Sequence, residues 1–166
     1  MGIGTKEEQL YLQNHALEQY RATFFRQTMF AEFELDTHEV VEGGDVLTAE
    51  GLCETYKGLL EKYFGPKVVQ DPGIEFEWSR IPHFYYDFYV YQYATGFAAA
   101  QTLAGRIVKG EGVDNYLKFL SLGSSYDPLD ALRVAGVDLE SPQPIEEALR
   151  IFGETVAGMS KTLFGE

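Results

Sequence analysis

The sequence has one cysteine, three histidines and little positive charge. Lysine and arginine number 13 against 26 aspartates and glutamates, which leaves a formal net charge of −13. Nucleic acids and anionic membrane surfaces both favour clustered basic residues, so neither is expected as a partner. Because Cys53 stands alone, no disulfide can form within the chain, and a reducing compartment is expected.

Long apolar runs are also missing. The most apolar stretch, residues 97–108, is interrupted by Gln101, Thr102, Gly105 and Arg106, and it is shorter than the roughly 20 residues that cross a bilayer. No basic start followed by an apolar segment marks a secretory signal. A cytoplasmic protein without membrane contact is therefore expected. The 166 residues, 45% of them apolar and 23% charged, fit one domain with a real core.

Helix signals fill most of the chain. Thr5 and Glu8 form a capping-box pattern, and Thr48 can cap a second helix. Glycine or proline stops most segments, and apolar residues repeat within them at helical spacing. We expect helices at about 5–35, 48–64, 83–109, 112–122, 128–136 and from about 141 onward, and a loop with one short turn at 67–82. In the last helix the residues expected to face inward are Leu149, Phe152, Val156, Met159 and Leu163. The predicted class is all-α, as a single helical domain or fragment over residues 1–166.

The most unusual stretch runs from Phe84 to Tyr93 and directly follows His83. Seven of its ten residues are aromatic, and five are tyrosines. A buried phenol must find a hydrogen-bond partner or it costs free energy. The stretch is therefore either a costly part of the core or the wall of a polar pocket.

A helix over 83–109 would gather part of this stretch on one face. At about 100° per residue, that face would hold His83, Tyr86, Val90, Tyr93 and Phe97, with Tyr89 at its edge. Phenols and an imidazole on one face could donate hydrogen bonds to a developing oxyanion. The alternative is a tyrosine-rich core helix whose hydroxyls bond to neighbouring groups.

Metal ligands are poorly supplied. The run from His38 to Glu42 reads His-Glu-Val-Val-Glu, which begins like a zinc-peptidase helix but has a glutamate where the second histidine is required. His15, His38 and His83 are far apart in sequence, and no metal site is predicted in this chain. Cys53 is expected to be inert packing on the inward side of its helix.

Several strings in the sequence resemble the oligoendopeptidase F family. Arg26-Gln-Thr-Met-Phe-Ala-Glu-Phe-Glu34 resembles one of its helices, and the string from Pro82 to Gly96 resembles its most recognisable stretch after the zinc motif. Segments 119–125, 128–133 and 135–138, with the closing helix, are similar to its C-terminal part. The resemblance covers nearly the whole chain, in order.

The resemblance implies an enzyme class and a fold. The family consists of cytosolic zinc metallopeptidases that cut oligopeptides; they are related to thimet oligopeptidase and have an all-helical fold around a channel. Their zinc is held by a His-Glu-x-x-His helix and a downstream glutamate. This sequence has no His-Glu-x-x-His. The resemblance therefore implies the C-terminal part of such a catalytic domain, with zinc in the complete enzyme, none bound by this chain, and no activity of the chain alone.

The resemblance also implies site residues and partners. His83, Tyr93 and Tyr86 are implied as catalytic groups, with Tyr85 and Tyr89 as substrate-binding alternatives because the loop after the histidine differs in length among relatives. The implied partners are an oligopeptide substrate and a zinc-bearing segment. A domain cut in two exposes apolar surface, so self-association is also expected. Two other readings stay open: a non-catalytic helical module that binds peptides along the aromatic wall, and a self-associating scaffold.

Overall fold

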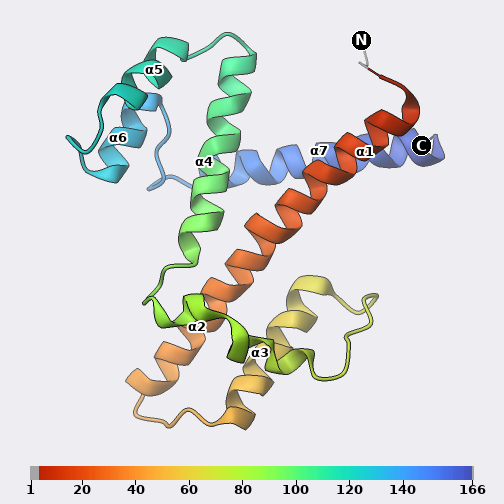
Figure 1. Cartoon of the computed structure of the whole chain (residues 1–166), viewed down its shortest axis with the longest axis vertical. Coiled ribbons are helices and arrows are strands. Elements are labelled where there is room, and N and C mark those ends of the chain that lie inside the picture. Colours follow the sequence, from red (N-terminus) through yellow and green to blue (C-terminus); the bar gives the residue numbers. More distant parts are fainter. Residues whose placement is uncertain (1–3, 166) are drawn as a thin grey trace. The chain divides into compact units, whose positions relative to one another are not determined.

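A computed structural model of the protein describes residues 4–165, which form helices joined by turns and loops (Figure 1). The α-helices are α1 (Lys6–Gln19), α2 (Arg26–Glu42), α3 (Ala49–Phe64), α4 (Tyr91–Val108), α5 (Val113–Ser121), α6 (Pro128–Ala135) and α7 (Gln143–Phe164). A π-helical segment, η1 (Tyr20–Phe25), precedes α2, and two 3₁₀ helices, η2 (Ile74–Arg80) and η3 (Pro82–Tyr85), precede α4. No strand occurs among the described residues, and the predicted all-α class is confirmed.

Most of the predicted helices are found close to their expected bounds. The capping box of Thr5 and Glu8 is present, and the Thr48 hydroxyl accepts a hydrogen bond from the Gly51 amide at 3.1 Å. The first predicted helix continues to Glu42, beyond its expected end near residue 35. It consists of α1, η1 and α2 in succession. Between residues 4 and 165, no helix combines the length and the apolarity needed to cross a bilayer.

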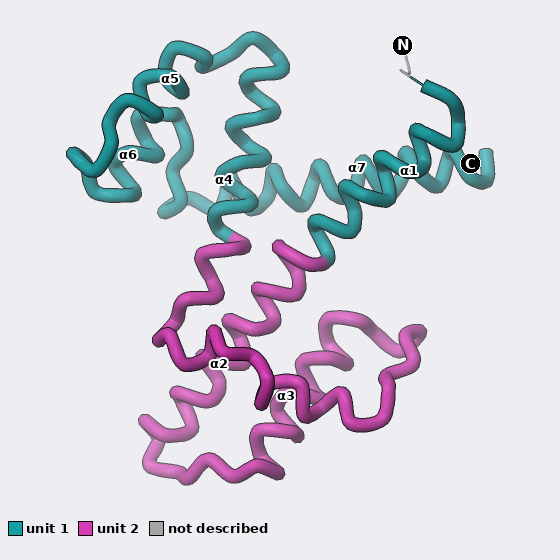
Figure 2. The backbone as a smooth tube through the Cα atoms, viewed as in Figure 1, with its two compact units in different colours: residues 1–21, 95–166 teal, residues 22–94 magenta. Residues whose placement is uncertain are grey.

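The chain divides into two compact units, drawn in two colours in Figure 2. Unit 1 combines residues 1–21 with residues 95–166, and unit 2 consists of residues 22–94. The whole aromatic stretch that follows His83 lies in unit 2.

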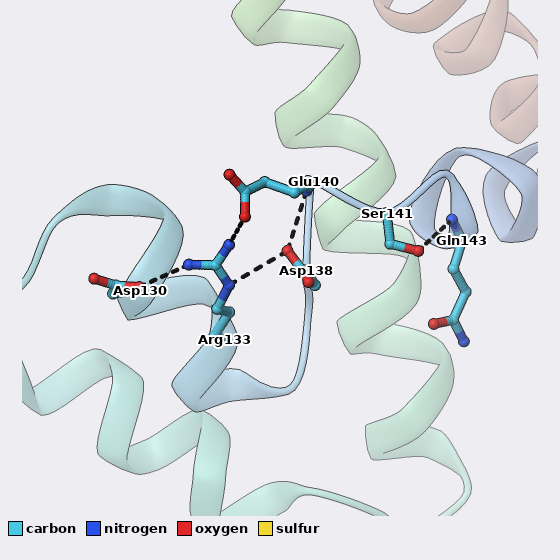
Figure 3. A network of polar contacts seen from close by, with 6 residues as sticks. All are labelled: Asp130, Arg133, Asp138, Glu140, Ser141 and Gln143. Atoms are coloured by element: carbon cyan, nitrogen blue, oxygen red, sulfur yellow. Dashed lines mark hydrogen bonds and ion pairs between the residues drawn. The ribbon is translucent and has the colours of Figure 1, made fainter.

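In unit 1, α1 packs against α7, and α5 packs against α6. The Tyr20 ring lies 4.8 Å from the Phe97 ring and 5.4 Å from the Phe152 ring. Arg133 of α6 ties the following loop to the helix, because its guanidinium pairs with Asp130 at 2.7 Å and also with Asp138 and Glu140 (Figure 3).

The inward face predicted for α7 is partly wrong. Leu149, Val156 and Leu163 are each more than 40% exposed, whereas Pro144 and Ala148 are buried. The apolar stripe of α7 is wider than the face that unit 1 covers, and a periodic pattern cannot tell which part of such a stripe is covered.

In unit 2, the core forms between α2 and α3. Apolar residues at helical spacing meet there, and Val90 joins them from the segment before α4. The fully or nearly fully buried members are Met29, Phe30, Phe33, Tyr56, Leu59, Leu60 and Val90. Cys53 is half-buried, and its sulfur accepts a hydrogen bond from the Trp78 indole at 3.4 Å.

A buried carboxylate joins three elements of unit 2. Glu77 of η2 is 6% exposed and accepts hydrogen bonds from the Tyr56 hydroxyl of α3 and the Arg26 guanidinium of α2, both at 2.7 Å. Arg80 also pairs with it. A buried charge is tolerated only when it is paired and hydrogen-bonded, and here both carboxylate oxygens have donors.

Unit 2 should lose stability in acid through Glu77. Burial acts to raise the pKa of this carboxyl, but the hydrogen bonds from Tyr56 and Arg26 outweigh burial and lower the pKa below 4.5. A folded-state pKa below the unfolded value gives stability that is complete above about pH 4.5 and is lost as the pH falls through the folded-state pKa. Urea midpoints measured between pH 7 and pH 3 should therefore fall, and Glu77→Gln should flatten that fall. Equal pH slopes for the two proteins would contradict this role of Glu77.

The predicted helix over 83–109 is wrong in its first part. Residues 82–85 form the short 3₁₀ helix η3, and α4 begins only at Tyr91. Between them, Asp87 and Phe88 have φ of 48° and 56°, values that L-residues other than glycine rarely adopt. On one continuous helix, Phe84 and Val90 would lie about 120° apart and could not enter the same core. The turn allows both to pack in unit 2.

Candidate functional site: a histidine among three tyrosines

Four aromatic side chains meet in unit 2 at the start of α4. The imidazole of His83 has ring-centroid distances of 6.2 Å to Tyr86, 5.8 Å to Tyr89 and 6.0 Å to Tyr93. It stacks on Tyr89 and meets the other two rings edge to face. Tyr89 lies 6.1 Å from Tyr86 and 5.6 Å from Tyr93. We call these four residues the His83 cluster.

The His83 cluster lies at the surface of unit 2 and is not part of its core. Tyr86 is 62% exposed and Tyr89 39% exposed, while His83 and Tyr93 are half-buried. Polar side chains that solvent can reach can also be reached by a ligand. These tyrosines are therefore accessible at the surface of unit 2 and do not line a buried core helix.

Other residues of the same stretch anchor the backbone that carries the cluster to the core of unit 2. The Phe84 ring packs against Phe30 and Phe33 of α2 with centroid distances of 5.4 Å and 5.1 Å, and Val90 is fully buried. The Phe88 amide donates to the carboxylate of Glu34 at 2.6 Å. Apolar packing and one charged hydrogen bond thus fix the backbone on which the four polar rings stand.

The hydroxyl of Tyr93 lies 3.4 Å from Nε2 of His83, and the direction of this hydrogen bond depends on the imidazole tautomer. A contact of that length is weak, so both groups can exchange it for a stronger bond to a ligand. The hydrogen bond with Tyr89 raises the pKa of Tyr93 above its usual value of 10. The phenol therefore stays protonated near neutral pH and can donate to an oxygen that gains negative charge.

The structure brings together His83, Tyr86 and Tyr93, the three residues implied as catalytic, and adds Tyr89 to them. Tyr85, from η3, is 81% exposed and makes no ring contact among the described residues. Of the expected helical face, Val90 and Phe97 do not join the cluster: Val90 is in the core of unit 2, and Phe97 packs against Tyr20 in unit 1. The residues gather around a turn and not along a helix.

The sequence did not indicate that Glu34 and His38 would contact the aromatic stretch. Glu34 is 3% exposed, and the His38 ring lies 4.4 Å from the Phe88 ring. A signal for Glu34 was present, because it stands four residues after Phe30 on the stripe that forms the core. A glutamate at such a position must find a donor inside the protein.

The residues present do not fit a zinc site. Within 4–165, no three or more histidine, cysteine, aspartate or glutamate side chains are grouped so that they could hold a metal ion. His83 is surrounded by phenols, and a structural or catalytic zinc needs at least three protein ligands.

Comparison with known proteins shows that nearly the whole chain is similar to peptidases. The profile of Peptidase family M3 matches residues 3–151. Oligopeptidase PepF of Bacillus subtilis (strain 168) is 52% identical over 161 residues, which cover 95% of this chain and 24% of that protein. The chromosomal oligoendopeptidase F of Lactococcus lactis subsp. cremoris is 48% identical over 158 residues, covering 94% of this chain and 26% of that protein.

Solved structures agree with these sequence matches. The crystal structure of oligoendopeptidase-F from Enterococcus faecium superimposes with a TM-score of 0.94 at 43% identity, over 98% of this chain and 32% of that one. A putative peptidase from Chlamydophila abortus gives 0.88 at 39% identity, over 96% and 27%. The chain thus spans about a quarter to a third of the length of these relatives. With the family profile matched over most of its residues and the fold shared with oligoendopeptidase F, this chain belongs to peptidase family M3.

Proposed function

We propose that this chain supplies substrate-binding and oxyanion-stabilising groups to a zinc-dependent oligopeptidase that hydrolyses peptide bonds in short peptides. The observation that carries the proposal is the placement of His83, half-exposed, in ring contact with three tyrosines. An imidazole and neutral phenols can donate hydrogen bonds to a peptide carbonyl, and such bonds strengthen as its oxygen becomes negative.

In this proposal the residues of the site have two different roles. His83, Tyr86 and Tyr93 act on the reacting carbonyl, while Tyr89 and the exposed Tyr85 bind the peptide on either side of it. The position of the Tyr93 hydroxyl, 3.4 Å from Nε2 of His83, supports its role as a donor, because a protonated phenol donates. Zinc, when bound in the complete enzyme, would supply Lewis-acid chemistry at the same carbonyl.

The zinc ligands belong to another segment in this proposal, because the described residues do not provide a set of them. All of residues 1–166 would then form part of one catalytic domain, and the chain alone would be inactive. The work would take place in the cytoplasm, where a single unpaired cysteine is stable.

A second candidate function is association without catalysis. Val113, Leu117 and Leu120 of α5 are 41%, 57% and 58% exposed, and they add to the exposed apolar residues of α7. Apolar surface of this kind is typical of interfaces, either with the rest of a peptidase or with another copy. A particle size that rises with concentration, together with no affinity for peptides, would favour this candidate.

The proposed function predicts that the purified chain binds short peptides without cutting them. Peptide affinity should be measurable by calorimetry, and His83→Ala should weaken it because the ring contacts of the cluster meet at His83. Hydrolysis should begin only when a zinc-bearing segment from a related peptidase is added. Elemental analysis of the zinc-treated chain supplies the control, with an expected zinc content near zero. Peptide cleavage by the chain alone, with one tightly held zinc, would overturn the proposed division of the site.

A further inference from the structure

The turn that carries the His83 cluster is held in a conformation that its own residues disfavour. Asp87 and Phe88 both have left-handed φ, of 48° and 56°. Aspartate tolerates this region, but for a bulky residue such as phenylalanine it is an outlier. Such a conformation persists only where surrounding contacts determine it. The turn matters for the site because Tyr86 and Tyr89 stand on either side of these two residues.

Glu34 makes the one side-chain hydrogen bond that the described residues give to this turn. Its Oε1 accepts from the Phe88 amide at 2.6 Å, across 54 positions in sequence. The carboxylate is 3% exposed, so water competes little for the bond. A hydrogen bond to a charged group contributes a free energy comparable to the cost of holding one residue in a strained conformation.

A neighbouring glutamate on the same helix has different hydrogen-bond partners from Glu34. Glu32, two residues earlier, accepts from Lys62 and from the Tyr63 hydroxyl, and so joins α2 to α3. Glu34 instead reaches the turn, and its Oε2 is buried with no hydrogen-bond partner among the described residues. Burying a carboxylate with a single described hydrogen bond costs free energy, and an apolar side chain of the same size would stabilise the fold at least as well. Stability alone therefore does not explain a glutamate at this position.

We propose that Glu34 is a positioning residue that holds the Asp87–Phe88 turn in its left-handed form and thereby sets the spacing of the tyrosines around His83. The inference rests on the proposed function, because a fixed spacing matters only if the cluster binds a peptide. Glu34 touches no substrate in this account. It acts through the Phe88 backbone.

Two substitutions of nearly equal size separate the acceptor from the volume of the side chain. Glu34→Gln keeps a carbonyl oxygen where Oε1 lies, and because Oε2 has no described partner, an amide nitrogen there breaks no bond. Glu34→Met fills the same space without an acceptor. Glu39→Ala, an exposed glutamate further along α2, is the matched control. A fourth variant adds Asp87→Gly to Glu34→Met, because glycine adopts positive φ without strain.

The first measurement is hydrogen exchange of the Phe88 amide in the full chain. This exchange should be slow in the wild type and in Glu34→Gln, and faster by roughly tenfold or more in Glu34→Met, as expected for the loss of a buried bond of that strength. The second measurement is the affinity for a short peptide. We expect Glu34→Met to weaken binding by about tenfold, Glu34→Gln to stay close to wild type, and Asp87→Gly to restore part of the loss.

Each arm has a result that overturns the inference. Slow Phe88 exchange in Glu34→Met would show that the turn does not need the acceptor. Fast exchange with unchanged peptide affinity would show that the turn does not position the site. Glu34→Gln as damaging as Glu34→Met would mean that charge, and not the acceptor, is what matters. A wild-type chain that binds no peptide defeats the proposed function instead, and the exchange data then still decide whether Glu34 holds the turn.

Discussion

Replacing Tyr93 by phenylalanine should lower kcat for short-peptide hydrolysis by about 10²–10³, the usual effect of removing one donor to a developing oxyanion. The substitution deletes a single hydroxyl, which lies 3.4 Å from Nε2 of His83 and is protonated at neutral pH, as phenols are. KM should change little, since a bond that forms mainly in the transition state contributes to kcat. The measurement is steady-state cleavage of a short peptide by the chain together with a zinc-bearing segment.

The control for this experiment is the same chemical change at a tyrosine of the other unit. Tyr126 is 51% exposed and lies in unit 1, before α6, so Tyr126→Phe should leave both constants unchanged. If Tyr93→Phe instead raises KM and spares kcat, Tyr93 binds the peptide and does not stabilise the oxyanion. A change in neither constant would remove Tyr93 from the site.

Replacing Glu77 by alanine should destabilise unit 2 by about 3 kcal/mol or more, the range found when one partner of a buried ion pair is removed. The change would leave the half-buried guanidinium of Arg26 without its buried carboxylate, and the buried Tyr56 hydroxyl without its acceptor. Tyr56→Phe should cost less, about 1–3 kcal/mol, because it removes a donor and leaves both arginines paired. Urea unfolding at pH 7 measures both values.

Glu54→Ala, at an exposed position of α3, is the comparison for this series and should fall within about 0.5 kcal/mol of wild type. A small effect of Glu77→Ala would mean that water enters and solvates Arg26, and that the three-element junction contributes little. Peptide affinity is measured in parallel for each variant. It should fall only in variants whose unit 2 is partly unfolded under the assay conditions, because Glu77 is not a member of the His83 cluster.

Most helices of this protein could be predicted from local patterns. The capping box at Thr5 and Glu8, the cap at Thr48 and the stop at Gly65 are contacts between near neighbours in sequence, and the structure contains them. Their physical basis is the unsatisfied amides at a helix start and the freedom of glycine to adopt positive φ at a helix end. Local signals of this kind need no knowledge of the rest of the fold.

The start of α4 could not be predicted in the same way. The continuous run from His83 to Val108 contains no proline or glycine before Gly96, and the residues after Tyr93 favour a helix. The helical pattern is broken by residues far away in the sequence. Phe84 and Val90 pack in a core built by α2 and α3, and the Phe88 amide donates a hydrogen bond to Glu34. Tertiary contacts of this strength override the weak helix preference of an aromatic-rich segment.

In the His83 cluster, too, some features follow from the sequence and others only from tertiary contacts. The sequence by itself determined that an imidazole and several phenols stand within eleven residues of one another, and that a metal-ligand pattern is lacking. Only the tertiary structure decided that Tyr86, Tyr89 and Tyr93 surround His83 at the surface while Phe84 and Val90 are drawn into the core. The physical reason is that residue type fixes which chemistry is available, whereas which side chains face each other depends on a backbone turn held by a carboxylate 54 residues away.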